Sequence, residues 1–272
     1  MFIQRLGILA VVSAIGFAQQ TADTNTNRAK EILLAGVADK NPDTRIQAVL
    51  SVSLIDDDEE VISRLGPILD QDKDVQVRLA VVSCLGDFKH QTAIPILDKA
   101  LKDEAPEVGF AAAKVLFALK QPAGKQALSS VLSGEEKASS DFLTSHKRSA
   151  LRMLQTPSKL FMTAASATVP MAGVGLAVAS SQGILLEPGA SPRASAVLLL
   201  ESEKDPATVQ AIQTALSDKD WSVRAAAVHA TALRNDPVLK EEFVPLFDDK
   251  KDAVRFRAAA GYVRLALLSN QP

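Results

Sequence analysis

The chain has 272 residues and carries 30 Lys and Arg against 32 Asp and Glu, so its formal net charge is −2. A hydrophobic content of 47% is too high for a disordered chain and is enough for a sizeable core. The chain is not basic and has one Trp, one Tyr and one Cys, which argues against nucleic-acid binding, a disulfide scaffold and a Cys-rich zinc site.

Residues 1–18 have the layout of a secretory signal peptide. Arg5 gives a positive start, residues 6–18 carry no charge, and Gly16 and Ala18 are small residues at the spacing of a cleavage site. The apolar run is shorter than the roughly 20 residues that a membrane span needs. We therefore expect an exported protein, periplasmic or secreted after cleavage near Ala18, with a polar leader over residues 19–27.

A short pattern recurs along the rest of the chain. An acidic turn is followed by a basic residue that opens an Ala-rich run, with anchors at positions 45, 78, 109, 193, 224 and 257, of which Gly109 keeps the frame but lacks the basic side chain. Neighbouring anchors are 31 to 33 residues apart, except for one gap of 84. This period fits two helices of about 12 residues each with two turns. The pattern predicts stacked helix pairs over residues 28–155 and 191–272.

The two helices of each pair differ in polarity. The first, as in residues 75–85 and 221–233, is almost entirely Ala, Val and Leu and should be buried between neighbours. The second, as in residues 93–101, has apolar residues three or four apart and should be amphipathic. No convincing strand pattern appears. His229 and Cys84 lie in first helices and are expected to be packed core residues.

The Asp-rich turn, the Val77-Arg78 and Val223-Arg224 openings and the period of about 31 residues resemble HEAT-like repeats of the short type named after phycobilisome lyases. The resemblance covers residues 28–135 and 190–270 and suggests a bacterial exported protein of this family. It implies an all-α α-solenoid of about six or seven helix pairs, with second helices lining a concave binding face. Lyase activity does not follow, because function must be argued from a site. The resemblance makes these exposed second-helix residues candidates for partner contact: Lys99, Lys102, Lys125, Gln126, Gln210 and Gln213.

The repeated charged residues are expected to be structural. Each turn Asp can cap a helix, and the basic residue four positions later can meet it on one face. The same groups can instead form a ladder between units. The residues concerned are Arg45, Asp74, Arg78, Asp220, Arg224 and Arg257.

No sequence motif indicates catalysis, a cofactor or a metal. Asp70-x-Asp72-x-Asp74 copies the start of a calcium loop, but that loop needs Gly and Glu where the chain has Val75 and Val81. The three His residues share no motif. We therefore expect a protein that is not an enzyme.

Residues 156–190 interrupt the repeats as an irregular apolar insertion. Residues 160–186 contain no charge, and Pro and Gly divide them into short pieces. We favour a segment that packs against the solenoid over a partner-binding surface or a membrane helix, since no cluster of Lys or Arg flanks it. In the second case the contact would involve Phe161, Met162, Val169, Met171, Val174, Leu176 and Val178.

These observations together predict a scaffold or adaptor in the cell envelope that binds another protein on the solenoid surface and at the insertion. Two alternatives stay open. One is a lyase-like or accessory protein that holds a small ligand at the insertion, and the other is a membrane-associated assembly factor.

Overall fold

The protein is built from helices packed in two rows. The computed structural model describes residues 24–55, 59–88, 91–133, 184 and 190–269, and within these ranges the regular structure is helical with no strand. The all-α prediction is confirmed. Residues 1–23 and the insertion up to residue 183 lie outside the described residues, and so do the predicted signal peptide and the seven candidate contact residues between 161 and 178.

The described helices form six pairs. Residues 24–37 are helical and are followed by α2 (Pro42–Val52), α3 (Glu59–Gln71), α4 (Val75–Asp87), α5 (Ala93–Ala100), α6 (Pro106–Ala118) and α7 (Pro122–Ser133). After the insertion come α12 (Pro192–Leu199), α13 (Pro206–Ala215), α14 (Trp221–Ala232), the 3₁₀ helix η1 (Pro237–Asp248) and α15 (Asp252–Ser269).

Helix starts are fixed by local chemistry. Asn41, Asp74 and Asp220 have extended backbone and accept hydrogen bonds from first-turn N–H groups of α2, α4 and α14. Six helices, α2, α6, α7, α12, α13 and η1, begin with Pro, which lacks an N–H and already has a helical φ. Caps and prolines together set the pair boundaries that the repeat period predicted.

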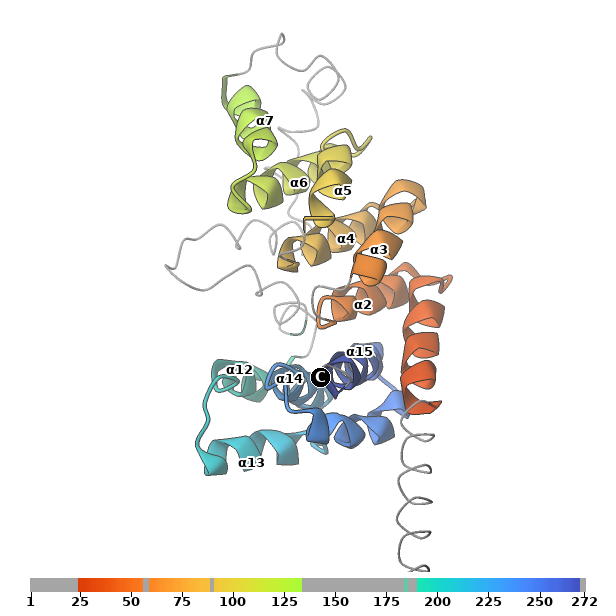
Figure 1. Ribbon diagram of the computed structural model, residues 1–272, viewed down its shortest axis with the longest axis vertical. Helices are drawn as coiled ribbons and strands as arrows, with labels where there is room; N and C mark the ends of the chain where they lie inside the picture. The colour runs from red at the N-terminus through yellow and green to blue at the C-terminus, as the bar shows by residue number, and fades with distance from the viewer. Residues whose placement is uncertain (1–23, 56–58, 89–90, 134–183, 185–189, 270–272) are drawn as a thin grey trace, which may run out of the picture.

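The order of the helices in space differs from their order in the chain. The first helices pack in the sequence α12, α14, α15, α2, α4 and α6, so the last helix of the chain lies against α2 (Figure 1). Helix 24–37 is the second helix of the pair that α15 begins, because the Cα of Gly36 lies close to the ring of Phe256 and to Ala48. We call the contact of α15 with helix 24–37 and α2 the seam. The two repeat regions therefore form one continuous solenoid.

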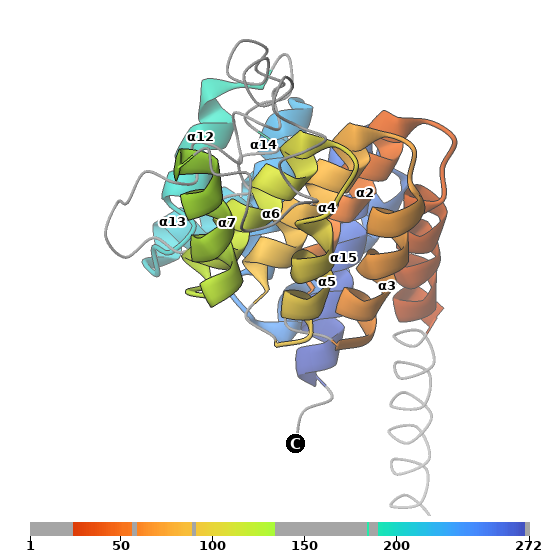
Figure 2. The same ribbon diagram turned by 90° about the horizontal axis from the view of Figure 1, so that it is seen from above.

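The solenoid is curved. First helices lie on the inner side of the arc and second helices on the outer side, and α7 and α12 lie toward the same side of the molecule (Figures 1 and 2). The expectation that second helices line the concave face is therefore wrong. First helices meet through fully buried small residues such as Ala48, Ala112, Ala227 and Ala260. Because interaxial distance depends on the side chains at the contact, this row is the shorter one and becomes the inner one.

The repeats begin earlier than the sequence predicted. Residues 24–27 belong to helix 24–37, and the Asn25 side chain donates a hydrogen bond to Glu241 of η1. The prediction of a loose leader is wrong for these four residues. The polar composition that suggested a leader reflects a second helix with one face on the surface.

Candidate functional site

Neighbouring units, except at the seam, are joined by ion pairs with two hydrogen bonds each. In each pair the arginine lies near the start of a first helix and the aspartate in the turn before the next first helix. The donor–acceptor distances lie between 2.7 and 3.1 Å for Arg45 with Asp72, Arg78 with Asp103, Arg193 with Asp218 and Arg224 with Asp249. We call these pairs the ladder.

A third hydrogen bond identifies the repeat arginine in four of the units. Arg78 Nη1 donates to the carbonyl of Asp72, six residues earlier, and Arg45 and Arg224 make the same bond. In α15 the residue that makes it is Arg255, at 3.0 Å from the carbonyl oxygen of Asp249. The choice of Arg257 as the last anchor is therefore wrong. Arg257 is fully buried at the seam and donates to Gln47 and to the carbonyl of Ala253.

The ladder aspartates are not the capping aspartates. Asp74 accepts from the N–H groups of Gln76 and Val77, whereas the partner of Arg78 is Asp103 in the next unit. The expected pairing of Asp74 with Arg78 within one unit is thus not formed, nor is that of Asp220 with Arg224. Each ladder aspartate also accepts the N–H two residues ahead, as Asp72 does from Asp74. A recurring acid two residues before the cap was the sequence signal for them.

Burial and hydrogen bonding act in opposite directions on these carboxyls. Burial raises the pKa of Asp72. Hydrogen bonds from Arg45 and from the Asp74 N–H lower this pKa by more than burial raises it, so it lies below its usual value. The hydrogen bonds from Arg193 and from the Asp220 N–H hold the pKa of Asp218 at about 2. Asp72 and Asp218 are therefore charged at neutral pH, and their ion pairs hold neighbouring units together.

The predicted contact residues lie on the outer face of the arc. Lys99 and Lys102 are exposed at α5, Lys125 and Gln126 are exposed on α7, and on α13 Gln210 is exposed and Gln213 half-buried. Lys99 forms an ion pair with Asp70 of α3. The structure brings the α5 and α7 residues into neighbouring units but places α13 at the other end of the solenoid (Figure 1). The six residues therefore do not form one patch.

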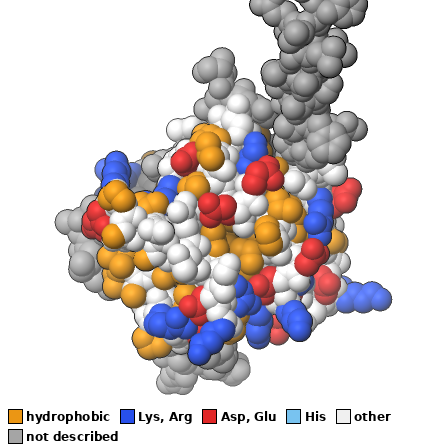
Figure 3. Space-filling view, turned by 90° about the horizontal axis from the view of Figure 1, so that it is seen from below, with side chains coloured by type: hydrophobic (Ala, Val, Ile, Leu, Met, Phe, Trp, Pro, Cys, Tyr) orange, Lys and Arg blue, Asp and Glu red, His pale blue; other side chains and the backbone are white. Residues whose placement is uncertain are grey.

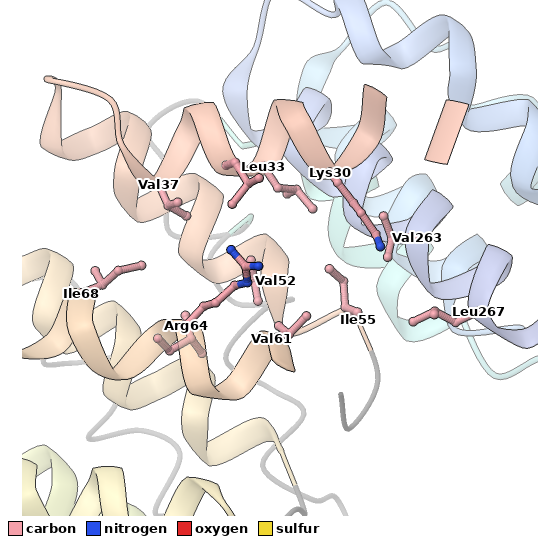
Figure 4. Close-up of a pocket in the computed structure, with 12 residues that line it drawn as sticks. Lys30, Leu33, Val37, Val52, Ile55, Val61, Arg64, Ile68, Val263 and Leu267 are labelled. Atoms are coloured by element: carbon pink, nitrogen blue, oxygen red, sulfur yellow. The ribbon is translucent and has the colours of Figure 1, made fainter. Parts of the chain in front are cut away.

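A cavity of roughly 150 Å³ lies at the seam. Its walls come from helix 24–37, the end of α2, α3 and α15 (Figure 4). Ten of its twelve lining residues are Leu, Val or Ile, and the other two are Lys30 and Arg64. No sequence pattern singled out this cavity, because its walls come from opposite ends of the chain.

The sequence model of a family described as HEAT repeats matches residues 62–139 and 184–262, more than half of the chain. The chain belongs to the HEAT repeat family. No curated protein matches it. HEAT repeats are commonly protein-interaction scaffolds and are generally non-catalytic.

His229 is a packed core residue of the HEAT repeats. Its Nε2 lies 3.6 Å from Glu201 Oε2, and its side chain is 2% exposed. Burial, with smaller contributions from Arg257 and Arg264, lowers the pKa of His229 to about 3, so at neutral pH this contact is not an ion pair. Cys84 is also buried, and burial raises the pKa of its thiol. Both residues are buried away from solvent, in agreement with their expected core roles.

The described residues show neither a metal site nor a membrane-spanning helix. They contain no group of three or more His, Cys, Asp and Glu arranged to hold a metal ion. No helix among them is long and apolar enough to cross a membrane. The outer surface of the HEAT repeats carries exposed apolar and charged side chains side by side, as the view from below shows (Figure 3).

Proposed function

We propose that the protein is an exported, non-enzymatic scaffold of the cell envelope that binds another protein on the outer face of its HEAT arc. The observation that carries this proposal is the division of charged residues. Ladder arginines such as Arg78, whose side chain is 4% exposed, are buried in ion pairs that hold neighbouring units together. The exposed side chains of the second helices remain available on a fixed frame.

The frame favours binding over a wide surface. A surface that is ordered before binding loses less conformational entropy when a partner docks. Stable interfaces take about 800 Å² from each partner, which calls for residues from more than one repeat. The neighbouring helices α5 and α7 supply Lys102, Lys125 and Gln126 on consecutive units, so this is the surface that we assign to the partner.

The repeat spacing and the N-terminal sequence support the finer assignments. Arg224 and Arg255 make equivalent hydrogen bonds 31 residues apart, which suits the short type of HEAT-like repeat. Export rests on the signal-peptide layout of residues 1–18. Cell fractionation with an epitope at the C-terminus would test export, and a precursor that stays at full length in the cytoplasm would contradict it.

The partner can be identified by cross-linking in the native envelope, followed by mass spectrometry. We expect Lys102→Glu combined with Lys125→Glu to remove the cross-linked partner, because two charges on the assigned surface change sign. Lys204→Glu, in the exposed turn between α12 and α13, is the matched control and should retain it. Retention of the partner by the double variant would show that α5 and α7 are not the interface.

The central insertion is a second candidate surface for partner contact, predicted from the sequence. Replacing Val174 and Leu176 with Asp should abolish co-purification of the partner if the insertion forms the interface, while the helical circular dichroism stays unchanged. Retention of the partner by this variant would limit the interface to the HEAT repeats.

A further inference from the structure

The seam contains both residues of a further ladder pair. Asp39 lies in the turn before α2, where the next units have Asp72 and Asp103, and like Asp72 it accepts the N–H two residues ahead. Arg255 lies in α15 where α4 has Arg78, and its Nη1 makes the same bond to a carbonyl six residues earlier. Yet Arg255 and Asp39, both among the described residues, form no ion pair with each other.

A second acid holds Arg255 within its own helix. Arg255 Nη2 donates to Asp252, and its Nε makes no hydrogen bond within the described residues. In Arg78 these two nitrogens are the ones that bind Asp103 of the next unit. Asp252 therefore competes for the donors that would complete the pair at the seam. The residues at its position in α2, α4 and α14 are not acidic: Pro42, Val75 and Trp221.

The Arg255 guanidinium lies close to the turn that carries Asp39. Its Cζ is 5.0 Å from the centre of the Phe256 ring, and that ring lies against Gly36 of helix 24–37. Asp39 follows three residues later, and its N–H donates to the carbonyl of Gly36. Both acids that suit Arg255 are thus near it, one on its own helix and one across the seam.

The seam is also the joint between two arms of the solenoid. We call α2 to α7 the N-terminal arm, and α12 to α15 with helix 24–37 the C-terminal arm. Turn 38–41 links helix 24–37 to α2, so Asp39 lies in the connection between the arms. A cavity of roughly 150 Å³ lies at this joint, and empty space removes contacts that would resist movement.

We propose that Arg255 is a latch between the two arms, which exchanges its Nε and Nη2 donors between Asp252 of its own helix and Asp39 across the seam. The structure shows the open state, and pairing with Asp39 gives the closed state. Each state contains one ion pair, so a small bias selects between them. In the open state the arms move relative to each other. In the closed state a ladder pair holds them as it holds other neighbouring units.

The first test compares Asp39→Asn in two backgrounds, with the unfolding equilibrium constant measured in urea. In the parent, where Arg255 pairs with Asp252, this change should alter the constant less than about twofold. In Asp252→Val, which copies the residue of α4, Arg255 is released to Asp39, so the same change should raise the constant about tenfold. Asp252→Asn is a second background of nearly the same shape. Asp43→Asn, an exposed acid in the first turn of α2, is the matched control and should act equally in all backgrounds.

The second test follows the arms directly by pulsed electron spin resonance. Gln210→Cys on α13 and Lys125→Cys on α7 place spin labels at exposed positions of the two arms, and Cys84 is buried away from the label. We expect a narrower distribution of label distances in Asp252→Val than in the parent, because the closed latch restricts the joint. Adding Asp39→Asn to Asp252→Val should restore the parent width.

Two results would overturn the latch. One is an Asp39→Asn effect that agrees within about twofold in the parent and in the Asp252 backgrounds, in variants whose circular dichroism matches the parent. The other is a distance distribution as broad in Asp252→Val as in the parent. Neither measurement involves a protein partner, so the latch and the scaffold proposal fail separately.

Discussion

The ladder and the seam join neighbouring units by different chemistry. At each ladder contact an arginine forms two hydrogen bonds to an aspartate of the next unit, as in Arg78 with Asp103. At the seam this pairing is replaced. Arg255 pairs with Asp252 in its own helix, while the aspartate in the corresponding turn, Asp39, accepts the N–H of Asn41.

Buried contacts take the place of the ladder at the seam. Arg257 donates to Gln47 across α15 and α2, and Arg264 donates to the carbonyl oxygen of Leu54 at 3.0 Å. Thr44 donates to Asp252 at 2.8 Å. These bonds join residues 208 to 210 positions apart in the chain, so forming them closes a long loop. The loop-closure entropy cost at the seam is therefore larger than at the ladder contacts, which join residues 25 to 27 positions apart.

The largest expected effect is at the seam. Phe256→Ala removes a ring that is 2% exposed and that lies against Gly36. We expect a loss of about 3–5 kcal/mol in the free energy of unfolding, as for other buried Phe. Urea unfolding measures the loss, and hydrogen exchange should show that helix 24–37 loses its protection first.

Leu85→Ala in α4 is the matched control for that prediction. Leu85 is also fully buried but lies away from the seam. Leu85→Ala should lower the free energy of unfolding by about 2–5 kcal/mol. The hydrogen-exchange protection of helix 24–37, compared with that of α2, should stay unchanged. Equal loss of protection in both variants would show that the seam is no weaker than a ladder contact.

The next effect compares two pairs of the ladder. Arg78→Met leaves Asp103, whose side chain is 9% exposed, without its cation, and we expect a cost of about 3 kcal/mol. Arg193→Met should cost less than about 1 kcal/mol, because the Arg193 side chain is 54% exposed and solvent screens the pair. Urea unfolding of the two variants checks the order, and a reversed order would contradict the burial argument.

The sequence predicted the local features of the ladder but not the partners. The period was readable because the same short pattern recurs along the chain. The first-helix Arg residues and the capping Asp74 and Asp220 were readable because each depends on residues within one turn of helix. The ladder acids were missed because Asp72 and Asp103 are chosen by contact with a neighbouring unit. Arg255 was missed because Arg257, two residues on, also fits the pattern.

The seam and its cavity were beyond sequence reasoning. Nothing in the pattern around residues 24–37 shows that this helix completes the unit of α15, since the two segments lie at opposite ends of the chain. The direction of curvature depends on how closely Ala-rich helices approach in space. Sequence periodicity gives the spacing of residues along one helix. It therefore predicts neither the pairing of helix 24–37 with α15 nor the direction of curvature.

Acidification should weaken the solenoid through His229. The ordinary pKa of His is 6.5, whereas the pKa of His229 in the folded chain is about 3. Burial lowers it most, and the charges of Arg257 and Arg264 lower it further. The unfolded chain binds the proton more tightly, so the stability that His229 contributes is complete above pH 6.5 and falls as the pH drops. At pH 5 the loss is about 2 kcal/mol relative to pH 7. His229→Leu should remove this slope in urea titrations, and an unchanged slope would assign it to other groups.

The smallest effect tests whether an exposed ion pair beside the seam, between helix 24–37 and η1, resembles the ion pairs of the ladder. Arg28 of helix 24–37 pairs with Asp248 of η1 at 2.6 Å, but the side chains are 42% and 75% exposed. A double-mutant cycle with Arg28→Gln and Asp248→Asn should give a coupling below about 1 kcal/mol that weakens further in salt. The Arg28 guanidinium also lies over the Phe247 ring, so Arg28→Gln alone should cost more than Asp248→Asn. A coupling above about 2 kcal/mol, well beyond the range of exposed pairs, would mean that the contact of helix 24–37 with η1 depends on charge as the ladder does. The expected small value would show that this exposed pair contributes less than a buried ladder pair such as Arg78 with Asp103.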